Sequence, residues 1–346
     1  MKAHHCLLAG GWPDPDAGSD DATRVPARTE WPFWDPSQDI ARFRCHAETG
    51  CKVQGKGLVM AAPVDAVLHD GSVIRVTTHG AGPALLLPVR LEPYPPEQEE
   101  TMRKWGGDPG LGLALVAGLS GSNRLIVGDY EGHRMAHPAA ETLTPDNLAT
   151  DLLAIADAGG ADDFGYYGYS WLALAGLQLA LRTDRLRALA MGGFPPWDGP
   201  YRSMLAVTRA AHAASTQALD PSAVPLAEAE PGDWDSVTVQ TTEAQTRQFV
   251  TLYEALQDFD DVGAPVPPGL SCLAFAGAND QIDYSGQWGG VRVSIGEPLA
   301  RHRDALAAAG WDVQVLPGLD HLSAMHSSVV LPILRVWLGK VGWARA

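Results

Sequence analysis

The stretch FGYYGYSWLALAGLQLALRT, residues 164–183, changes its pattern at Ser170. The residues before Ser170 are aromatic and glycine-rich, which favours a buried strand, and the residues after it are rich in Leu and Ala, which favours a helix. A serine at a strand-to-helix turn is held in a strained conformation that exposes its hydroxyl at the edge of the sheet. Gly168 suits such a turn because neighbouring backbone can approach it without meeting a Cβ. The stretch therefore predicts a nucleophilic serine.

Strand and helix patterns alternate on both sides of this turn. Two β-rich runs, 64–69 and 72–78, flank Asp70-Gly71, a dipeptide suited to the positive φ angles of a hairpin turn. Further strands are expected at 84–89, 125–130, 186–193, 270–277 and 311–318, and helices at 144–160, 298–310 and 329–339. Thr144 is the expected N-cap of the first of these helices. The alternation predicts an α/β fold with a mainly parallel sheet covered by helices on both faces.

The segment 194–267 does not fit the alternation and predicts a helical cap, or lid, inserted over the carboxyl ends of the strands. The two parts of the α/β core are then 61–193 and 268–346. Residues 1–60 are rich in Gly, Pro, Asp and Trp and show neither a period of 3.6 nor a period of 2. An irregular N-terminal extension is expected there.

The charge balance excludes several kinds of partner. The chain has 25 Lys and Arg against 41 Asp and Glu, a formal net charge of −16, which would repel phosphate backbones and anionic membrane surfaces. No run of about 18 apolar residues and no signal-peptide pattern is present, so a soluble, cytoplasmic protein is expected. The expected partner is a small-molecule acyl substrate rather than nucleic acid or membrane, and a homodimer is left open.

The cysteines Cys6, Cys45, Cys51 and Cys272 are too few and too unevenly spaced for a disulfide scaffold. Cys45 and Cys51 could bridge in an oxidising compartment or hold half a metal site, but no CxxC or paired His completes such a site. Neither a metal nor an organic cofactor is expected.

From about Val64 to Leu338 the chain resembles the α/β-hydrolase superfamily, in its capped branch with a serine nucleophile. The order of catalytic residues in that family is nucleophile, acid and base. The segment GDYEGHRMAHP, residues 128–138, also resembles the family segment after the fourth strand, which is not itself catalytic. The resemblance implies a catalytic triad that begins with Ser170.

The other two members of the triad follow from the same resemblance. AFAGAND, residues 274–280, is similar to the family's strand, glycine and acid, which implies Asp280 as the acid, with nearby Asp283 as a competitor. LPGLDHLSAM, residues 316–325, is similar to the loop that delivers the histidine, which implies His321 as the base.

Two positions depart from the family. The family often has His-Gly after its third strand, where this chain has Pro88-Val89-Arg90. Proline has no N–H, so the oxyanion hole would combine the N–H of Trp171 with that of Val89 or Arg90. Leu172 occupies a place where the family usually has Gly or Ala, which predicts a wider gap between helix and sheet below the turn.

The resulting functional prediction is a serine hydrolase that cleaves a carboxylic ester, lactone or thioester through an acyl-enzyme on Ser170. Tyr169, Trp197 and Tyr201 are candidate substrate-binding walls. Acyl transfer and carbon–carbon bond hydrolysis would use the same triad, and a ligand-binding homologue without catalysis is a further alternative. Relatives that open epoxides or remove halides use a carboxylate nucleophile, so Ser170 argues against those reactions.

Overall fold

A sheet of eight strands runs through the part of the chain that the structure, a computed structural model, describes, namely residues 62–217 and 241–345. In spatial order its strands are β1 (Val64–Val67), β2 (Val73–His79), β4 (Arg124–Val127), β3 (Ala84–Leu87), β5 (Phe164–Tyr169), β6 (Leu186–Gly192), β7 (Ser271–Gly277) and β10 (Trp311–Leu316). β2 runs antiparallel to both neighbours, and every pair from β4 to β10 is parallel. The predicted α/β class is confirmed.

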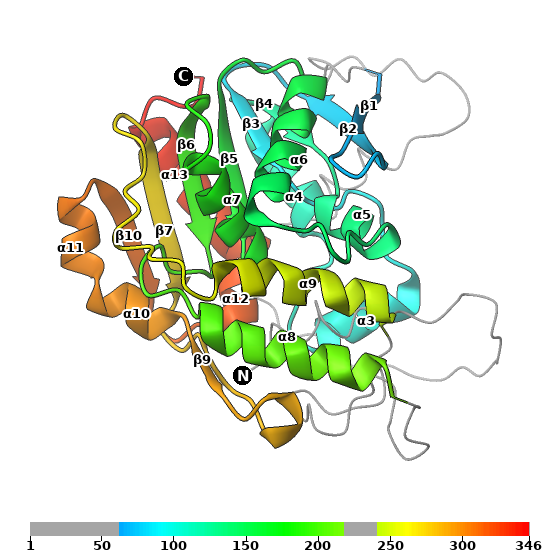
Figure 1. The fold of residues 1–346 in the computed structure, drawn as a ribbon. Coiled ribbons are helices and arrows are strands. Elements are labelled where there is room, and N and C mark those ends of the chain that lie inside the picture. The colour runs from blue at the N-terminus through cyan, green and yellow to red at the C-terminus, as the bar shows by residue number, and fades with distance from the viewer. Residues whose placement is uncertain (1–61, 218–240, 346) are drawn as a thin grey trace, which may run out of the picture. The chain divides into compact units, whose positions relative to one another are not determined.

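Helices fill the connections between the strands (Figure 1). They are α3 (Pro96–Lys104), α4 (Leu111–Leu119), α5 (Tyr130–Ala136), α6 (Pro145–Ala158), α7 (Trp171–Ala180), α8 (Tyr201–Ser215), α9 (Glu243–Leu256), α10 (Gly296–Arg301), α11 (Arg303–Ala308), α12 (His321–Met325) and α13 (Ser327–Lys340). A separate antiparallel pair, β8 (Gln281–Asp283) and β9 (Arg292–Ser294), follows β7. The side chain of Thr144 accepts a hydrogen bond from the Asn147 N–H at 3.3 Å, as expected of the N-cap of α6.

The two faces of the sheet carry separate apolar layers. Leu86 packs in the layer with α6 and α7, whereas its neighbours Leu85 and Leu87 pack in the layer with α4 and α13. Successive strand residues point to opposite faces, so a strand covered on both sides is apolar throughout. This explains why 84–87 forms a continuous apolar run. Figure 1 shows α6 and α7 in front of the sheet and α13 behind it.

The N-terminal hairpin has the predicted turn. Val67 pairs with Val73, and Gly71 between them has φ of 81°, a conformation that glycine adopts without strain. The fully buried guanidinium of Arg134, on α5, donates to Asp70 Oδ2 at 2.9 Å and to Ser72 Oγ at 2.6 Å. Burial raises the pKa of Asp70, but the hydrogen bonds from Arg134 and Ser72 outweigh it and hold that pKa well below its usual value. The hairpin is thereby tied to the helix that follows β4.

Two helical regions differ from the sequence prediction. The connection from β3 to β4 contains α3 and α4, to which no helix was assigned from the pattern. The single helix expected at 298–310 is divided at His302, between α10 and α11. The His302 Nε2 lies 2.7 Å from Asp198 Oδ2, and Arg301 also pairs with Asp198 at 2.9 Å. A tertiary contact therefore coincides with the break, which local periodicity does not report.

Helix α7 lies very close to β5. A Cβ on Gly168 would lie 2.3 Å from the carbonyl oxygen of Leu172, and one on Gly176 would lie 2.6 Å from the Tyr166 ring. The prediction of a wider gap at Leu172 is therefore wrong. The side chain of Leu172 lines the cavity above the turn, and glycines make the close contacts between helix and strand.

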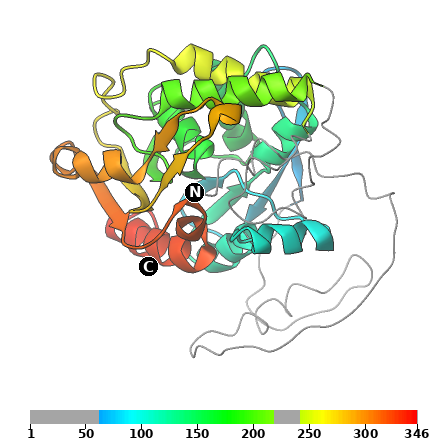
Figure 2. The same ribbon diagram turned by 90° about the horizontal axis from the view of Figure 1, so that it is seen from below.

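The insertion between β6 and β7 contains α8 and α9, which pack along each other. In Figure 1 they cross the end of the sheet at which β5, β6 and β7 finish, and Figure 2 shows them side by side on one flank, opposite α12 and α13. The start of α9 is set by a capping box, in which Thr242 and Gln245 exchange hydrogen bonds. The predicted 1–60 extension and the middle of the insertion, 218–240, lie outside the described residues.

We expect Gly176→Ala to lower the free energy of unfolding by about 1–3 kcal/mol, because the added methyl group overpacks a filled contact. Tyr166 cannot move aside easily, since it is fully buried and its hydroxyl donates to the Leu172 carbonyl at 2.7 Å. The matched control is Gly339→Ala on α13, where nothing lies within 4 Å of the new Cβ. Urea denaturation should show the control unchanged or stabilised by about 0.5–1 kcal/mol. Equal stabilities for both variants would contradict the close approach.

Candidate active site

Ser170 forms the turn between β5 and α7 in a conformation that few non-glycine residues adopt. Its φ is 59° and its ψ is −128°. Such backbone costs of order 1–3 kcal/mol and persists where surrounding structure enforces it. Here the Ser170 N–H donates to the Gly192 carbonyl at 2.8 Å, and the Ser170 carbonyl accepts from the N–H groups of Ala173 and Leu174. The turn is thus held by β6 on one side and by α7 on the other.

Asp280 and His321 form a buried pair, with Asp280 Oδ2 2.7 Å from His321 Nδ1. Their residue exposures are 1% and 3%, so water does not screen the contact. Asp283, the competing acid, is exposed on β8 and pairs with Arg292 at 2.5 Å. The carboxylate that faces the imidazole is therefore that of Asp280.

The loops after β7 and β10 bring these two side chains together. The N–H of Ala278 donates to the Leu316 carbonyl at 2.8 Å, and the N–H of Asn279 donates to the Leu319 carbonyl at 2.9 Å. A Cβ on Gly277 would lie 2.2 Å from the Leu319 carbonyl oxygen. The glycine three residues before Asp280 is thus required because the histidine loop crosses over it.

His321 is the first residue of α12 and contacts the turn of Ser170 through Tyr169. The Tyr169 hydroxyl donates to the His321 carbonyl at 2.7 Å, and the two rings meet edge to face at 5.1 Å. Gly193, with φ of 63°, lies beneath both rings: a Cβ there would come within 2.5 Å of Tyr169 and 3.0 Å of His321. Ser170 and His321 both line the same cavity.

Three backbone N–H groups are available for an oxyanion hole. Those of Val89, Arg90 and Trp171 donate to no backbone carbonyl within 62–217 and 241–345. The loop after β3 is braced by the Arg90 side chain, whose Nε donates to the Glu92 carbonyl at 2.9 Å and whose Nη1 lies 3.5 Å from Asp129 Oδ2. This bracing orders the stretch in which the family's usual His-Gly is absent.

The cavity above Ser170 has a volume of about 520 Å³, which suits a small organic ligand. Most of its wall comes from the loop after β3 and from α3, α4, α5 and α12, while α9 contributes Gln245. Sequence reasoning missed the contribution of α3. It noted the 128–138 segment only as non-catalytic, although Asp129, Glu131 and Met135 of that segment line the cavity.

Glu131 is a second ionisable group in this cavity. Burial, and then the negative charge of Asp129, raise its pKa from 4.5 to about 8. The indole of Trp171 lowers the pKa in part, although its buried Nε1 makes no hydrogen bond of ordinary geometry among the described residues. Family resemblance alone could not have singled out Glu131.

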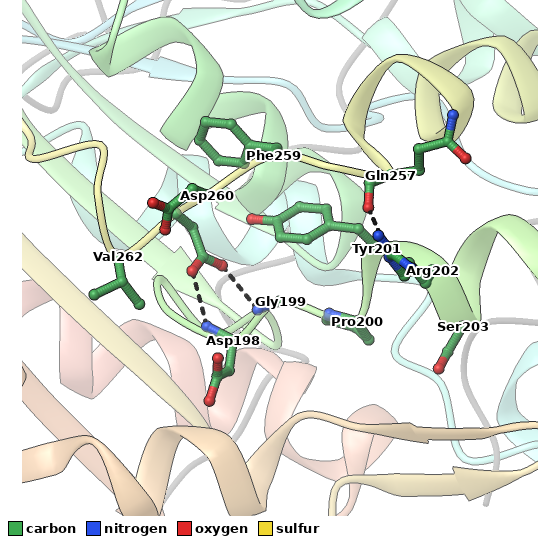
Figure 3. A pocket seen from close by; sticks show the side chains of 11 residues that line it. Asp198, Gly199, Pro200, Tyr201, Arg202, Ser203, Gln257, Phe259, Asp260 and Val262 are labelled. Atoms are coloured by element: carbon green, nitrogen blue, oxygen red, sulfur yellow. Dashed lines mark hydrogen bonds between the residues drawn. The ribbon is translucent and has the colours of Figure 1, made fainter.

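The other two predicted wall residues lie elsewhere. Trp197 packs edge-on against the His302 ring at 6.0 Å. Tyr201 lines a separate hollow of about 320 Å³ at the start of α8 (Figure 3). There the Asp261 carboxylate accepts the N–H groups of Asp198 and Gly199 at 3.0 and 2.8 Å. Of the three predicted walls, Tyr169 is the one that lines the Ser170 cavity.

Among the described residues no group of His, Cys, Asp and Glu has the arrangement of a metal site. Cys272 is buried, and burial raises the pKa of its thiol to about 12. The other cysteines lie outside the described residues. No described helix is long and apolar enough to cross a membrane.

No protein-family model matches this sequence, and no curated protein matches it. Solved structures are similar to it. A hydrolase from Pseudomonas aeruginosa PA01 is 19% identical with a TM-score of 0.50, over 80% of this chain and 98% of that chain. A carboxylesterase of the thaumarchaeon Nitrososphaera gargenis is 18% identical with a TM-score of 0.48, over 78% and 96%. A bromoperoxidase from Bacillus anthracis is 16% identical with a TM-score of 0.47, over 80% and 100%. The likeness to the first of these, together with the sheet order, shows the fold.

We expect Asp280→Asn to slow the reaction of Ser170 with a fluorophosphonate by orders of magnitude, on the order of 10⁴-fold for turnover in a comparable triad. An amide would hold the imidazole in the wrong tautomer for a base. Asp283→Asn, three residues away and exposed, is the matched control and should react at the wild-type rate. If both substitutions slowed the reaction equally, Asp280 would not be the acid that orients His321.

The raised pKa of Glu131 predicts a pH-dependent stability. Between pH 4.5 and about 8 the unfolded chain loses the Glu131 proton while the folded chain keeps it. The contribution of Glu131 to the free energy of unfolding is therefore fully present below pH 4.5 and is lost as pH rises towards 8. Thermal melts of wild type and Glu131→Gln should show the wild type losing stability relative to the variant over this range, with the difference level above it. Glu97→Gln, an exposed site on α3, should follow the wild type throughout. If the melting temperatures of wild type and Glu131→Gln changed with pH in the same way, the raised pKa of Glu131 would be contradicted.

Proposed function

We propose that this chain, which has the α/β-hydrolase fold, is a serine hydrolase that cleaves an ester bond of a small organic substrate through an acyl-enzyme. The observation that carries the proposal is Ser170 in a positive-φ turn lining the same cavity as a buried imidazole whose Nδ1 contacts Asp280 at 2.7 Å. Ester is meant broadly, and includes lactones and thioesters.

In the proposed mechanism, Ser170 Oγ attacks the acyl carbonyl while His321 Nε2 takes the hydroxyl proton. Asp280 accepts the Nδ1 hydrogen, which keeps the proton off Nε2 and stabilises the imidazolium that forms. The N–H groups of Trp171 and of Val89 or Arg90 stabilise the oxyanion. His321 then returns the proton to the leaving group, and water, activated by His321, releases the acid.

The shape of the cavity limits the substrate. A volume of about 520 Å³ accommodates a small molecule, and the walls are mainly apolar with a few polar groups near Ser170. We propose that α3, together with α8 and α9, acts as the cap, so that substrate choice depends on two insertions rather than one. Acyl transfer or carbon–carbon bond hydrolysis would use the same triad, and a non-catalytic ligand receptor would use the cavity without it.

Intact-protein mass spectrometry after exposure to a fluorophosphonate tests the nucleophile. We expect one adduct on the wild type and none on Ser170→Ala, because an activated serine reacts far faster than an ordinary hydroxyl. Ser203→Ala is the matched control, since Ser203 lines the other hollow and should leave labelling intact. If the wild type is folded yet unlabelled, the serine-hydrolase proposal fails and the ligand receptor takes its place. If the wild type is labelled at Ser170, a panel of esters and thioesters with an added amine acceptor separates hydrolysis from acyl transfer.

A further inference from the structure

Glu131 lines the Ser170 cavity and has no cationic partner. No Lys, Arg or His of the described residues forms an ion pair with it, and the side-chain contact that lowers its pKa is with the indole of Trp171. The neighbouring carboxylate differs: Asp129 accepts the Gly132 N–H at 2.9 Å and lies 3.5 Å from the Arg90 guanidinium. A carboxylate has about four acceptor sites, so one contact with an indole leaves Glu131 capacity to bind a ligand.

Four other polar residues of the cavity wall have partners of their own. Asp108, before α4, accepts the N–H groups of Gly110 and Ser327 at 3.0 and 2.9 Å. Gln245, on α9, donates to the Met135 carbonyl at 2.7 Å. On α12, His321 is paired with Asp280, and Arg90, the arginine of the cavity wall, is engaged with Asp129 and its own loop. No described side chain is thus placed to neutralise an ionised Glu131.

The environment of Glu131 makes an uncompensated charge costly. Met102, Met135 and Leu172 line the same cavity and are apolar, and the carboxylate of Asp129 adds repulsion. Glu131 is half-buried, and a carboxylate in such a wall with no counter-charge is stabilised either by a proton or by a cation. The indole of Trp171, whose Nε1 is buried, is the one side chain among the causes of the Glu131 pKa that favours the ionised form.

We propose that Glu131 is a specificity-determining residue that binds a positively charged ammonium group of the substrate while the acyl carbonyl lies at Ser170. This inference rests on the proposed function and names the substrate class for the same site. An ammonium ion supplies the counter-charge that the protein itself does not, and the net charge of −16 favours the approach of cations.

A proton neutralises Glu131 when no cation is bound. With a pKa of about 8, Glu131 carries a proton at neutral pH. When the cation binds, the carboxylate ionises and that proton passes to the solvent, so binding strengthens as pH rises towards 8. The released proton is a signature that a merely steric role of Glu131 would not produce.

Two isosteric ester pairs test the position of the charge. Acetylcholine and neohexyl acetate differ in the charge of the leaving group, and the ethyl esters of glycine betaine and of tert-butylacetic acid differ in the charge of the acyl group. The ratio of kcat/KM for charged over neutral ester should fall about tenfold or more from wild type to Glu131→Gln in at least one pair. Because each ratio is measured on one protein, a general loss of activity cancels. Glu97→Gln should retain both wild-type ratios, and unchanged ratios in Glu131→Gln for both pairs would overturn the inference.

A binding experiment separates this inference from the proposed function. Tetramethylammonium chloride, against sodium chloride at equal ionic strength, should raise the melting temperature of Ser170→Ala but not of Ser170→Ala/Glu131→Gln. Calorimetry at pH 7 in buffers of different ionisation enthalpy should show proton release in the former alone. If tetramethylammonium binding depends on Glu131 but fluorophosphonate does not label the wild type, the cation site is supported and the serine-hydrolase proposal fails. Equal shifts in both proteins, or none in either, would overturn the cation site even if Ser170 is labelled.

Discussion

The site depends on the backbone of one residue, Ser170, held at positive φ between β5 and α7. That conformation is maintained because the Ser170 N–H is bound by the Gly192 carbonyl of β6, while the N–H of Gly193 is bound by the Phe275 carbonyl of β7. The carboxyl ends of these neighbouring parallel strands therefore lie at the same edge of the sheet, and the loops that follow them meet there. Glycines at 168 and 193 are needed there because a side chain would collide with the helix or with the histidine.

The pair of Asp280 and His321 follows from the same edge. Both sit in loops that begin where β7 and β10 finish, and backbone hydrogen bonds between those loops bring the carboxylate to the imidazole. Asp283 lies on the small β8–β9 pair and is turned to Arg292 and solvent instead. Two acids that are close in sequence therefore have different surroundings, and the difference is made by the loops around them.

Two carboxylates in or beside the cavity, those of Asp280 and Glu131, have different electrostatic surroundings. In the Asp280–His321 pair, the carboxylate has the imidazole as its hydrogen-bond partner. Glu131 is uncompensated: its burial and the nearby Asp129 favour the neutral form, and the pKa rises to about 8. Asp129 is kept in place by Arg90, which also braces the loop that offers the Val89 and Arg90 N–H groups. The loop after β3 and the acidic wall of the cavity are thus joined through Arg90.

The sequence by itself determined the hairpin at Asp70-Gly71, the N-cap at Thr144, and the strand and helix on either side of Ser170, because turn chemistry, caps and apolar periodicity are local properties. Asp280 and His321 were predicted through the resemblance to the α/β-hydrolase superfamily rather than through a local pattern. Tertiary structure alone decided which acid faces His321, how α3 and α5 build the cavity wall, and that Leu172 lines the cavity rather than widening the gap beneath α7. It also placed Trp197 and Tyr201 away from the cavity and left Glu131 inside it without a counter-charge. These features arise from contacts between segments far apart in the chain, whose free energies no local pattern encodes.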